Sequence, residues 1–439
     1  MSSATFIKAR IYMAEQFRST PGLTANNTLY LTFGKVDAWA NDLSPDIANT
    51  SVATENQVWS NMIGAKRLFS GDMVHVIPRN DWTANTVYTA YDHMNVDLYN
   101  ANIKFYVVTS DFNVYKCIAN ANGAMSTVQP TAINPGALSE TLDGYIWKYM
   151  YSVSDSDQLR FTTAQYIPIR TVTVNDGSLQ WQVQDQVTEG QINSILVTNG
   201  GRDYGNSANI VVTVGGDGDS AYATAVVNTS TNTISSIIVN DYGYGYSYAT
   251  ISISGGGGVD ATARAIISPP GGHGSDAMYE LGGSNLMING FLRNSEQGVF
   301  PVSNDYRQVS LIANPMKYDG TATASNLSIL QAYTITTVGS GDYIPDEIVY
   351  QGSSYNTSLF SGKIVSWDSA NGQAVIINTS GSPTSQSLFG ANSSTSRYVS
   401  GVDTPDLMRY SGTLLYVDNV LPITRAVDQT EDFKIVMKF

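Results

Sequence analysis

The end of the chain shows the clearest alternation of apolar and polar residues. Four apolar residues share one face of an extended segment and two lysines the other: Phe433, Ile435, Met437 and Phe439, against Lys434 and Lys438. A period of two is typical of a half-buried β-strand. Because chain ends fray unless they are docked, we expect this strand to pair with a sheet formed earlier in the chain. Before it, the apolar run 414–417 is followed by a turn signal at Asp418-Asn419.

Two stretches have apolar residues at helical spacing. Residues 4–18 predict a short amphipathic helix that ends before Pro21-Gly22, and residues 55–69 predict a second one. The expected apolar faces are Phe6, Ala9, Met13 and Phe17 in the first helix, and Val58, Met62, Ala65 and Phe69 in the second. Thr54 and Gln57 have the spacing of a capping box for the second helix.

The remaining pattern up to residue 170 predicts strands. Strands are expected at 29–33 and 73–78, and a hairpin joins 103–109 to 112–118 through a turn at Ser110-Asp111. The most aromatic segment is 143–151, whose large residues on both faces predict a strand buried on both sides. We interpret Asp143 as the first residue of the turn before this strand.

Residues 188–270 contain an internal duplication. Segment 192–197 recurs at 234–239, 42 residues later, and segment 223–227 recurs at 263–267, 40 residues later. Each copy predicts strand, glycine–tyrosine turn, strand, glycine-rich turn and strand, so the two copies fit a small β-sandwich or paired β-modules. Pro269-Pro270-Gly271-Gly272 is interpreted as the linker that closes this insertion.

Residues 321–400 predict a second all-β region. Strands are expected at 347–350, 362–367 and 375–377, and Asn371-Gly372 is a strong hairpin signal. The Ser/Thr/Asn-rich run 378–400 is expected to lead back to the core.

These elements predict an α+β, predominantly β protein with a discontinuous core domain and inserted all-β, sandwich-like modules. The expected parts are the N-terminal core (1–187), the duplicated module (188–270), a return to the core (271–320), the second module (321–400) and a C-terminal closing segment (401–439). Such a division fits 439 residues, which suffice for two to four domains.

Charge and composition argue against some classes of binding partner. The net charge of −14 argues against a nucleic-acid partner, because phosphate recognition needs clustered Lys and Arg. Only 14% of residues are charged and Tyr occurs 27 times, a surface that suits permanent protein contacts. We see no apolar run of the roughly 18 residues that a membrane helix needs, and no signal-peptide core, so we expect no membrane partner and folding in a cytoplasm.

Candidate chemistry is sparse. The single cysteine, Cys117, excludes an intrachain disulfide and is expected to be a buried, inert thiol. His75 lies between two valines in a predicted strand, and His273 lies in the glycine linker; His93 is the third histidine. Motifs for zinc proteases, hydrolase nucleophiles and phosphate loops are absent from the sequence. We therefore expect no catalytic, cofactor-binding or metal-binding residues and no enzymatic activity.

Three alternatives stay open at this point. Residues 215–219, Gly-Gly-Asp-Gly-Asp, resemble calcium-binding repeats, but a hairpin turn explains them better because the partner tract 255–258 has no aspartate. The tyrosines between Tyr242 and Tyr248 could bind a glycan by ring stacking, although packing between modules explains them more simply. A glycosidase pair among the carboxylates would leave no sequence signature.

Several short motifs, in order, resemble the gene-eight baseplate wedge protein family of T-even-like contractile-tailed phages. They cover most of residues 10–170, 285–318 and 404–439. The motifs are Phe33-Gly34 with Trp39, Val58-Trp59 to Lys66, Val76 to Arg79 with Asp81-Trp82, Val114 to Cys117, Asp143 to Trp147, Val299-Phe300-Pro301, Tyr306-Arg307-Gln308 to Asn314-Pro315, Asp406 to Arg409, Ser411-Gly412 and Asp428 to Glu431.

This resemblance implies a virion protein of the tail baseplate, assembled in the host bacterial cytoplasm. It further implies a homodimer that contacts other wedge subunits and has a mechanical role when the baseplate rearranges. A receptor- or glycan-binding tail protein that uses the glycine–tyrosine repeats is the alternative function, and a polysaccharide-degrading enzyme is the third.

Overall fold

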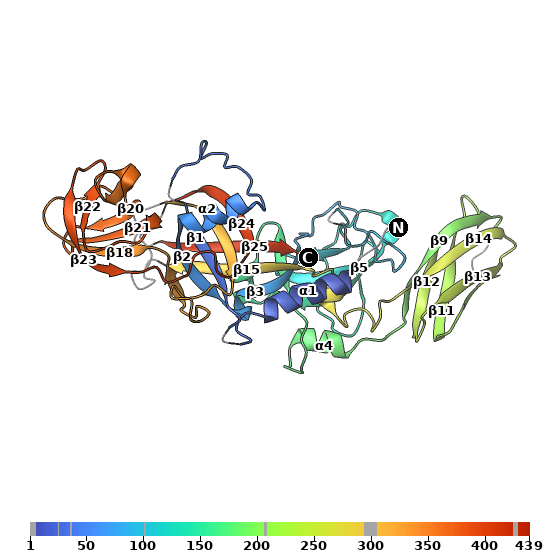
Figure 1. The fold of residues 1–439 in the computed structure, drawn as a ribbon. Coiled ribbons are helices and arrows are strands. Elements are labelled where there is room, and N and C mark those ends of the chain that lie inside the picture. The colour runs from blue at the N-terminus through green and yellow to red at the C-terminus, as the bar shows by residue number, and fades with distance from the viewer. Residues whose placement is uncertain are drawn as a thin grey trace. The chain divides into compact units, whose positions relative to one another are not determined.

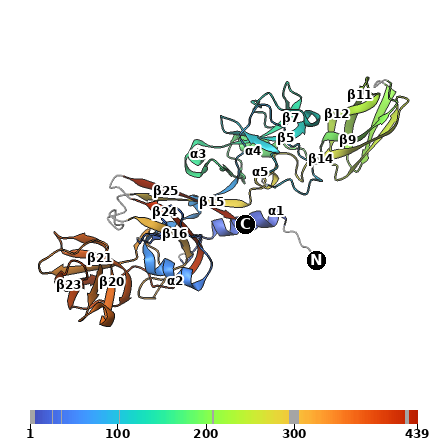
Figure 2. The same ribbon diagram turned by 90° about the horizontal axis from the view of Figure 1, so that it is seen from above.

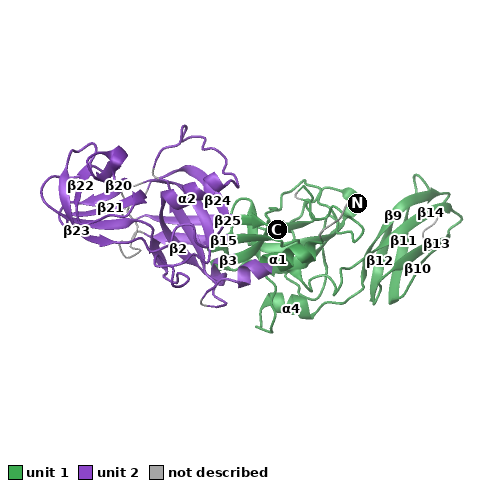
Figure 3. Cartoon of the chain, viewed as in Figure 1, with its two compact units in different colours: residues 1–14, 74–287, 436–439 green, residues 15–73, 288–435 purple. Residues whose placement is uncertain are grey.

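The protein is described from a computed structural model, which covers residues 6–24, 26–35, 37–100, 102–205, 209–293, 305–424 and 429–439. The predicted α+β, predominantly β class is confirmed: short helices accompany several β-sheets (Figures 1 and 2). Residues 299–301 and 428 of the motifs named above lie outside the described residues. The chain forms two compact units, residues 1–14, 74–287 and 436–439, and residues 15–73 and 288–435 (Figure 3).

The second unit contains a five-stranded sheet ordered β17-β2-β1-β16-β24. Its strands are β1 (Leu29–Gly34), β2 (Met62–Leu68), β16 (Tyr306–Ala313), β17 (Ser328–Leu330) and β24 (Thr413–Ile423). All six residues of β1 are buried, because the strand lies at the centre of the sheet between β2 and β16. Helix α2 (Val52–Asn61) packs Val58 and Trp59 into the core next to this sheet.

The predicted helix at 55–69 is wrong in its second half. Helix α2 ends at Asn61, and residues 62–68 form β2, paired with β1 along its length. The cap is Ser51, whose hydroxyl accepts a hydrogen bond from the Thr54 amide, so the predicted capping box is also wrong. Apolar residues of β2 are buried on both faces, and such a run fits a central strand as well as a helix face.

The same unit contains a closed six-stranded barrel ordered β18-β21-β20-β19-β22-β23. Its strands are β18 (Tyr333–Val338), β19 (Ile348–Gln351), β20 (Phe360–Asp368), β21 (Gln373–Gly381), β22 (Ser387–Gly390) and β23 (Ser396–Asp403). The predicted hairpin at Asn371-Gly372 joins β20 to β21, and Gly372 has a φ of 63°. The short helical turns of this unit are η1 (Ser70–Asp72) and η4 (Tyr355–Thr357).

Two further sequence interpretations are corrected in this unit. The polar run 378–400 supplies β22 and β23 of the barrel, because Leu388 and Val399 point into its core between small polar residues. The turn expected at Asp418-Asn419 is absent, since β24 continues through both residues and pairs there with β16. The Asn419 side chain accepts a hydrogen bond from Gln308 Nε2 at 2.8 Å, so the asparagine serves a strand contact.

The first unit contains an aromatic four-stranded sheet ordered β4-β5-β7-β6. Its strands are β4 (Tyr106–Val108), β5 (Asn113–Asn120), β6 (Ser139–Glu140) and β7 (Tyr145–Ser152). The predicted hairpin of β4 and β5 and the doubly buried strand β7 are confirmed, and Trp147 is fully buried. Helices α3 (Asp155–Phe161), α4 (Leu179–Asp185) and α5 (Ala277–Glu280) and the turn η2 (Ala121–Gly123) complete this part of the chain.

The duplicated segment folds into one six-stranded sheet ordered β13-β10-β11-β12-β9-β14. The strands are β9 (Ile192–Arg202), β10 (Ile210–Gly216), β11 (Asp219–Asn228), β12 (Thr233–Tyr244), β13 (Ala249–Gly255) and β14 (Val259–Ile267). The copies are interleaved: β11 of the first pairs with β12 of the second, and β14 of the second pairs with β9 of the first. Neither copy therefore forms a sheet by itself.

A four-stranded sheet ordered β25-β15-β3-β8 contains the predicted terminal strand. Its members are β3 (Met73–Pro78), β8 (Tyr166–Ile169), β15 (Asn285–Arg293) and β25 (Thr430–Lys438). The expectation that the terminal strand pairs with an earlier sheet is confirmed, since β25 lies beside β15.

Helix α1 (Ile7–Ser19) is present near the N-terminus, but its predicted apolar face is wrong. Phe6 and Met13 are exposed, whereas Ala14 is buried and Ile7 and Ile11 are half-buried. The face of the helix that packs against the protein is thus shifted by about one residue from the predicted face. Over the described ranges, no helix has the length and apolar character to cross a membrane.

Candidate functional site: a buried charge cluster and converging motif segments

His273, expected in a glycine linker, lies in a buried charge cluster. The Lys116 ammonium of β5 donates a hydrogen bond to Glu280 Oε2 at 2.7 Å and lies 3.0 Å from His273 Nδ1. The Lys116 and Glu280 side chains are both fully buried. The Gly274 amide donates to the other Glu280 oxygen at 2.7 Å, so the segment before α5 wraps around this carboxylate.

The electrostatics of the cluster define its protonation. Burial would raise the pKa of Glu280, but the Lys116 ammonium and the adjacent His273 together outweigh burial and lower that pKa to about 2. Burial, and after it the nearby Lys116 ammonium, lower the pKa of His273 to about 4. His273 is therefore neutral at pH 7, and its Nδ1 accepts the Lys116 proton while Nε2 carries its own hydrogen.

This cluster holds three parts of the chain together. The Lys116 ammonium also lies 4.0 Å from the centre of the Tyr91 ring, which packs edge-on against His273. Strand β5, the Tyr91 loop and the segment before α5 are thus joined through one charge. Removing one partner of such a buried pair leaves an uncompensated charge, at a cost of roughly 3–5 kcal/mol. Sequence reasoning missed Lys116 and Glu280; the available signal was a lysine inside the otherwise apolar strand 114–118.

Cys117 has the role expected from the sequence, but the turn before β7 begins at Thr141 and not at Asp143, because the Gly144 amide donates to the Thr141 carbonyl oxygen. Asp143 accepts hydrogen bonds from Thr141 Oγ1 and from the Thr127 and Val128 amides. Burial alone would raise its pKa, but these donors lower that pKa to about 2, so a charged aspartate ties the 126–128 loop to the turn before β7. The Cys117 thiol is buried, and this burial raises its pKa, which makes it a poor nucleophile.

The other two histidines also contact backbone groups. His75 is buried in β3, and its Nδ1 lies 2.7 Å from the Gly283 carbonyl oxygen, which confirms the expected structural role. His93 Nδ1 accepts a hydrogen bond from the Ile267 amide at 3.3 Å. Among the described residues, His, Cys, Asp and Glu side chains do not gather in groups of three or more that could hold a metal ion.

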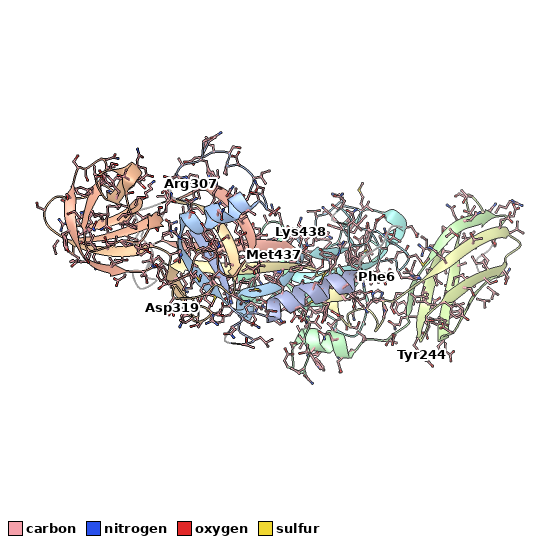
Figure 4. The ribbon with its side chains drawn as sticks, in the orientation of Figure 1. Phe6, Tyr244, Arg307, Asp319, Met437 and Lys438 are labelled. Carbon is pink, nitrogen blue, oxygen red and sulfur yellow. The ribbon has the colours of Figure 1, made fainter. Side chains whose placement is uncertain are left out.

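The glycine–aspartate tract forms the turn of a hairpin, as expected. It joins β10 to β11, and Asp217 Oδ1 accepts from the Ser247 and Tyr248 amides while Oδ2 accepts from Ser247 Oγ. The tyrosines that follow do not form one stacking face. Tyr246 is buried in the module core, whereas Tyr244 and Tyr248 are exposed (Figure 4 labels Tyr244).

Motif segments that are distant in sequence meet in the second unit. Arg307 donates to both oxygens of Asp42 at 3.0 Å, and the Trp39 indole donates to the Val420 carbonyl at 3.2 Å. The Asp42 pKa is lowered by its hydrogen bonds with Arg307 and with the Trp39 amide. Arg307 itself is buried, so this bidentate pair fixes the 37–51 loop against β16.

The 406–412 motif makes a second set of contacts. Asp406 Oδ2 accepts from the Leu330 amide at 2.7 Å, and Leu407 exchanges backbone hydrogen bonds with the Gln331 side chain. Gly412 has a φ of 74°, and an added Cβ would lie 2.4 Å from the Ala313 carbonyl oxygen. Only glycine fits this close approach, which explains why the 406–412 motif ends in a glycine.

The surface carries exposed apolar side chains close to these motifs. In the 37–51 loop, Leu43 and Ile47 are 89% and 95% exposed, although the loop is anchored by Asp42. A loop that holds large apolar residues in water on a fixed base is typical of a protein-contact surface. Geometry thus defines a multi-module, β-rich protein whose charges serve packing and whose exposed apolar residues suit assembly.

Comparison with known proteins identifies the same family as the motifs. Residues 11–133 match the family model Phage-Gp8, described as bacteriophage T4, Gp8. The chain is also similar to the baseplate wedge protein gp8 of Enterobacteria phage T4, with 21% identity over 196 residues, which cover 37% of this chain and 59% of that relative. The resemblance inferred from the sequence is therefore confirmed, and the chain spans about 59% of the length of this relative.

Proposed function

We propose that this protein is a structural subunit of a contractile phage tail baseplate, in which it serves as a wedge component. The observation that carries the proposal is the family match over residues 11–133, which includes the anchored loop with Leu43 and Ile47. The contacts of Arg307 with Asp42 support it, because they join two motif segments of the resemblance in one unit. The protein is made and assembled in the host cytoplasm and resides in the tail of the virion.

Mass spectrometry of purified tails and antibody labelling of particles test this location. The expected result is labelling at the distal end of the tail and recovery of the protein from isolated baseplates. A protein found in lysates but missing from tails contradicts the proposal.

The finer part of the proposal is a homodimeric scaffold that links other wedge proteins. Its low charged fraction of 14% and its exposed apolar loop residues favour lasting contacts over electrostatic steering. Light scattering of the isolated protein should give twice the chain mass of 47.3 kDa. A monomer or a trimer contradicts the dimer.

A double substitution tests whether the loop is an assembly surface. Leu43→Asp with Ile47→Asp should leave the melting curve nearly unchanged, since both side chains are already in water, and should abolish incorporation into baseplates. Leu142→Asp is the matched control, because Leu142 is equally exposed and lies outside the matched residues. Equal incorporation of both variants contradicts this role of the loop.

A second candidate function is glycan or receptor binding by the duplicated module. The favouring observation is that Tyr222, Tyr244 and Tyr248 expose their rings there. Replacing the three by Ala should then abolish adsorption to the host while particles still assemble. Normal adsorption excludes this function, and release of reducing sugars by the purified protein would instead favour an enzyme.

A further inference from the structure

A cavity of about 230 Å³ in the first unit lies beside the buried charge cluster. The residues around it come from five stretches of sequence and include Gly136, Ala137, Lys148, Gln186, Gln191, Tyr242 and His273. Two glycines of the segment 269–274 lie close to residues that line this cavity. A Cβ on Gly272 would lie 2.6 Å from the Thr188 carbonyl oxygen, and a Cβ on Gly274 would lie 3.2 Å from Lys148 Cε. The segment is therefore packed closely, with backbone against side chain.

Two side chains at this cavity can donate further hydrogen bonds. Lys148 is 3% exposed, and its ammonium donates to the Pro135 carbonyl oxygen at 2.6 Å, which leaves two of its three hydrogens. His273 is buried, and its Nε2 atom has no hydrogen-bond partner among the described residues. Because Nδ1 accepts from Lys116, Nε2 is the protonated nitrogen and hence a donor.

The charges around the cavity do not balance. Lys116 and Glu280 neutralise one another at 2.7 Å. Lys148 is a second buried cation, and its ammonium contacts a carbonyl oxygen but, among the residues that the structure describes, no carboxylate within ion-pair distance. Burial lowers the pKa of Lys148 to about 8, so it is still mostly charged at pH 7. An unpaired buried charge is costly, and an anion beside it offsets that cost.

We propose that this cavity binds a carboxylate group, held by the Lys148 ammonium and by His273 Nε2–H. A carboxylate has two oxygens that can accept from two separate donors, and its single charge matches the single excess positive charge of the site. A dianion such as phosphate would bring a second, unpaired charge into a desolvated cavity. This inference goes beyond the proposed structural function and does not depend on it.

The carboxylate has two sources, a free small acid or an Asp or Glu side chain of a neighbouring protein. Titration of the full chain with ¹³C-labelled acetate, followed by line width at constant ionic strength in sodium sulfate, tests the first source. A capped peptide, acetyl-Gly-Glu-Gly-amide, tests the second. Saturable binding of acetate alone assigns the site to a free acid, and tighter binding of the peptide assigns it to a protein side chain.

Neutral isosteres test the charge requirement on the unmodified protein. Acetamide and the corresponding Gln peptide should show no saturable binding, because they lack the anionic oxygen pair. Binding of acetamide as tight as that of acetate overturns the proposal, and so does the absence of saturable binding for both carboxylate probes.

Two variants place the binding in this cavity. Lys148→Met should weaken the binding roughly tenfold or more, since it removes a charge-assisted hydrogen bond, whereas Lys104→Met removes an exposed lysine of the same unit and should change nothing. Ala137→Leu fills the cavity from an exposed position without altering Lys148, and should weaken binding even where Lys148→Met fails to fold. Unchanged affinity in Ala137→Leu overturns the assignment.

Discussion

The two all-β regions of this chain assemble their six strands in different ways. The six strands of the barrel β18–β23 come from one continuous stretch that closes on itself. The sheet β9–β14 consists of two copies of a three-strand unit, which exchange neighbours so that each copy completes the other.

The tyrosine–glycine contacts show this exchange at single residues. Tyr204 of the first copy packs on Gly258 of the second, and Tyr246 of the second packs on Gly218 of the first. In each case an added Cβ would lie 2.4 Å from the ring. The glycine–tyrosine pattern therefore serves the core of the module, where each ring needs a partner residue without a side chain.

The cores differ in how completely they exclude water. The barrel buries its inward residues fully, and Ile335, Ile364 and Ile376 are each 0% exposed. In the duplicated sheet Ile192 is 0% exposed, but the other buried core residues keep 2–9% of their surface exposed and many residues packed against them are only half-buried. Burial on one side of a six-stranded sheet is thus less efficient than burial inside a barrel, and we expect the two regions to differ in stability.

The largest expected effect is a core truncation in the barrel. Ile376→Ala should cost about 4–5 kcal/mol, and Ile237→Ala, the same change in the duplicated sheet at 7% exposure, only about 2–3 kcal/mol. Ile376 packs against the backbone at Gly362, so the surrounding structure has little freedom to fill the cavity that Ile376→Ala would leave. Hydrogen exchange of peptides from each region measures local stability in this multi-domain chain. Equal losses would show that the two cores are equally well packed.

A pair of glycine substitutions tests the exchange between the copies. Gly218→Ala and Gly258→Ala should each cost about 1–3 kcal/mol, because each new methyl group displaces a tyrosine ring of the other copy. The two losses should agree, since the environments are duplicated. Gly205→Ala is the control, because nothing lies within 4 Å of its added Cβ. A loss at only one of the two glycines would contradict the symmetry.

Much of the fold could be predicted from alternation and turn chemistry. Strand β3 was predicted at its observed bounds, and the hairpin at Asn371-Gly372 needed only its turn residues. The run 62–69 could not be resolved, because apolar residues on both faces fit a helix or a buried strand equally. The strands β22 and β23 were missed because they close the barrel with small polar residues, and only Leu388 and Val399 mark their inward face.

The buried cluster was harder to predict than the fold. Lys116 and Glu280 are 164 residues apart, and their contact depends on how the segment 271–280 returns to β5. The glycines of that segment signal a linker in the sequence, whereas in the structure they permit close packing around Lys148 and Thr188. The lysine inside the apolar strand 114–118 signals a buried charge, but local patterns do not identify its partner.

The smallest expected effect is a loss of loop stability at acid pH, which we compare between the two regions. In the duplicated sheet, hydrogen bonds from Ser247 lower the pKa of Asp217 to about 2, below its ordinary value of 3.8. In the barrel, burial would raise the pKa of Glu347, but amide donors including Ser393 lower it. A lowered pKa means that each carboxylate stabilises its loop above its ordinary pKa, and that this contribution is lost as the pH falls through the lowered value.

Asp217→Asn and Glu347→Gln test this acid sensitivity. Each variant should be less stable than the wild type at pH 6 and should lose less stability between pH 4 and pH 2, because it has no carboxylate left to protonate. The Glu347 change should be the larger at pH 6, since that side chain is buried and accepts from three amides. Hydrogen exchange in each loop across this pH range measures both effects. Acid profiles of the variants that run parallel to the wild type would show that these carboxylates do not distinguish the two regions.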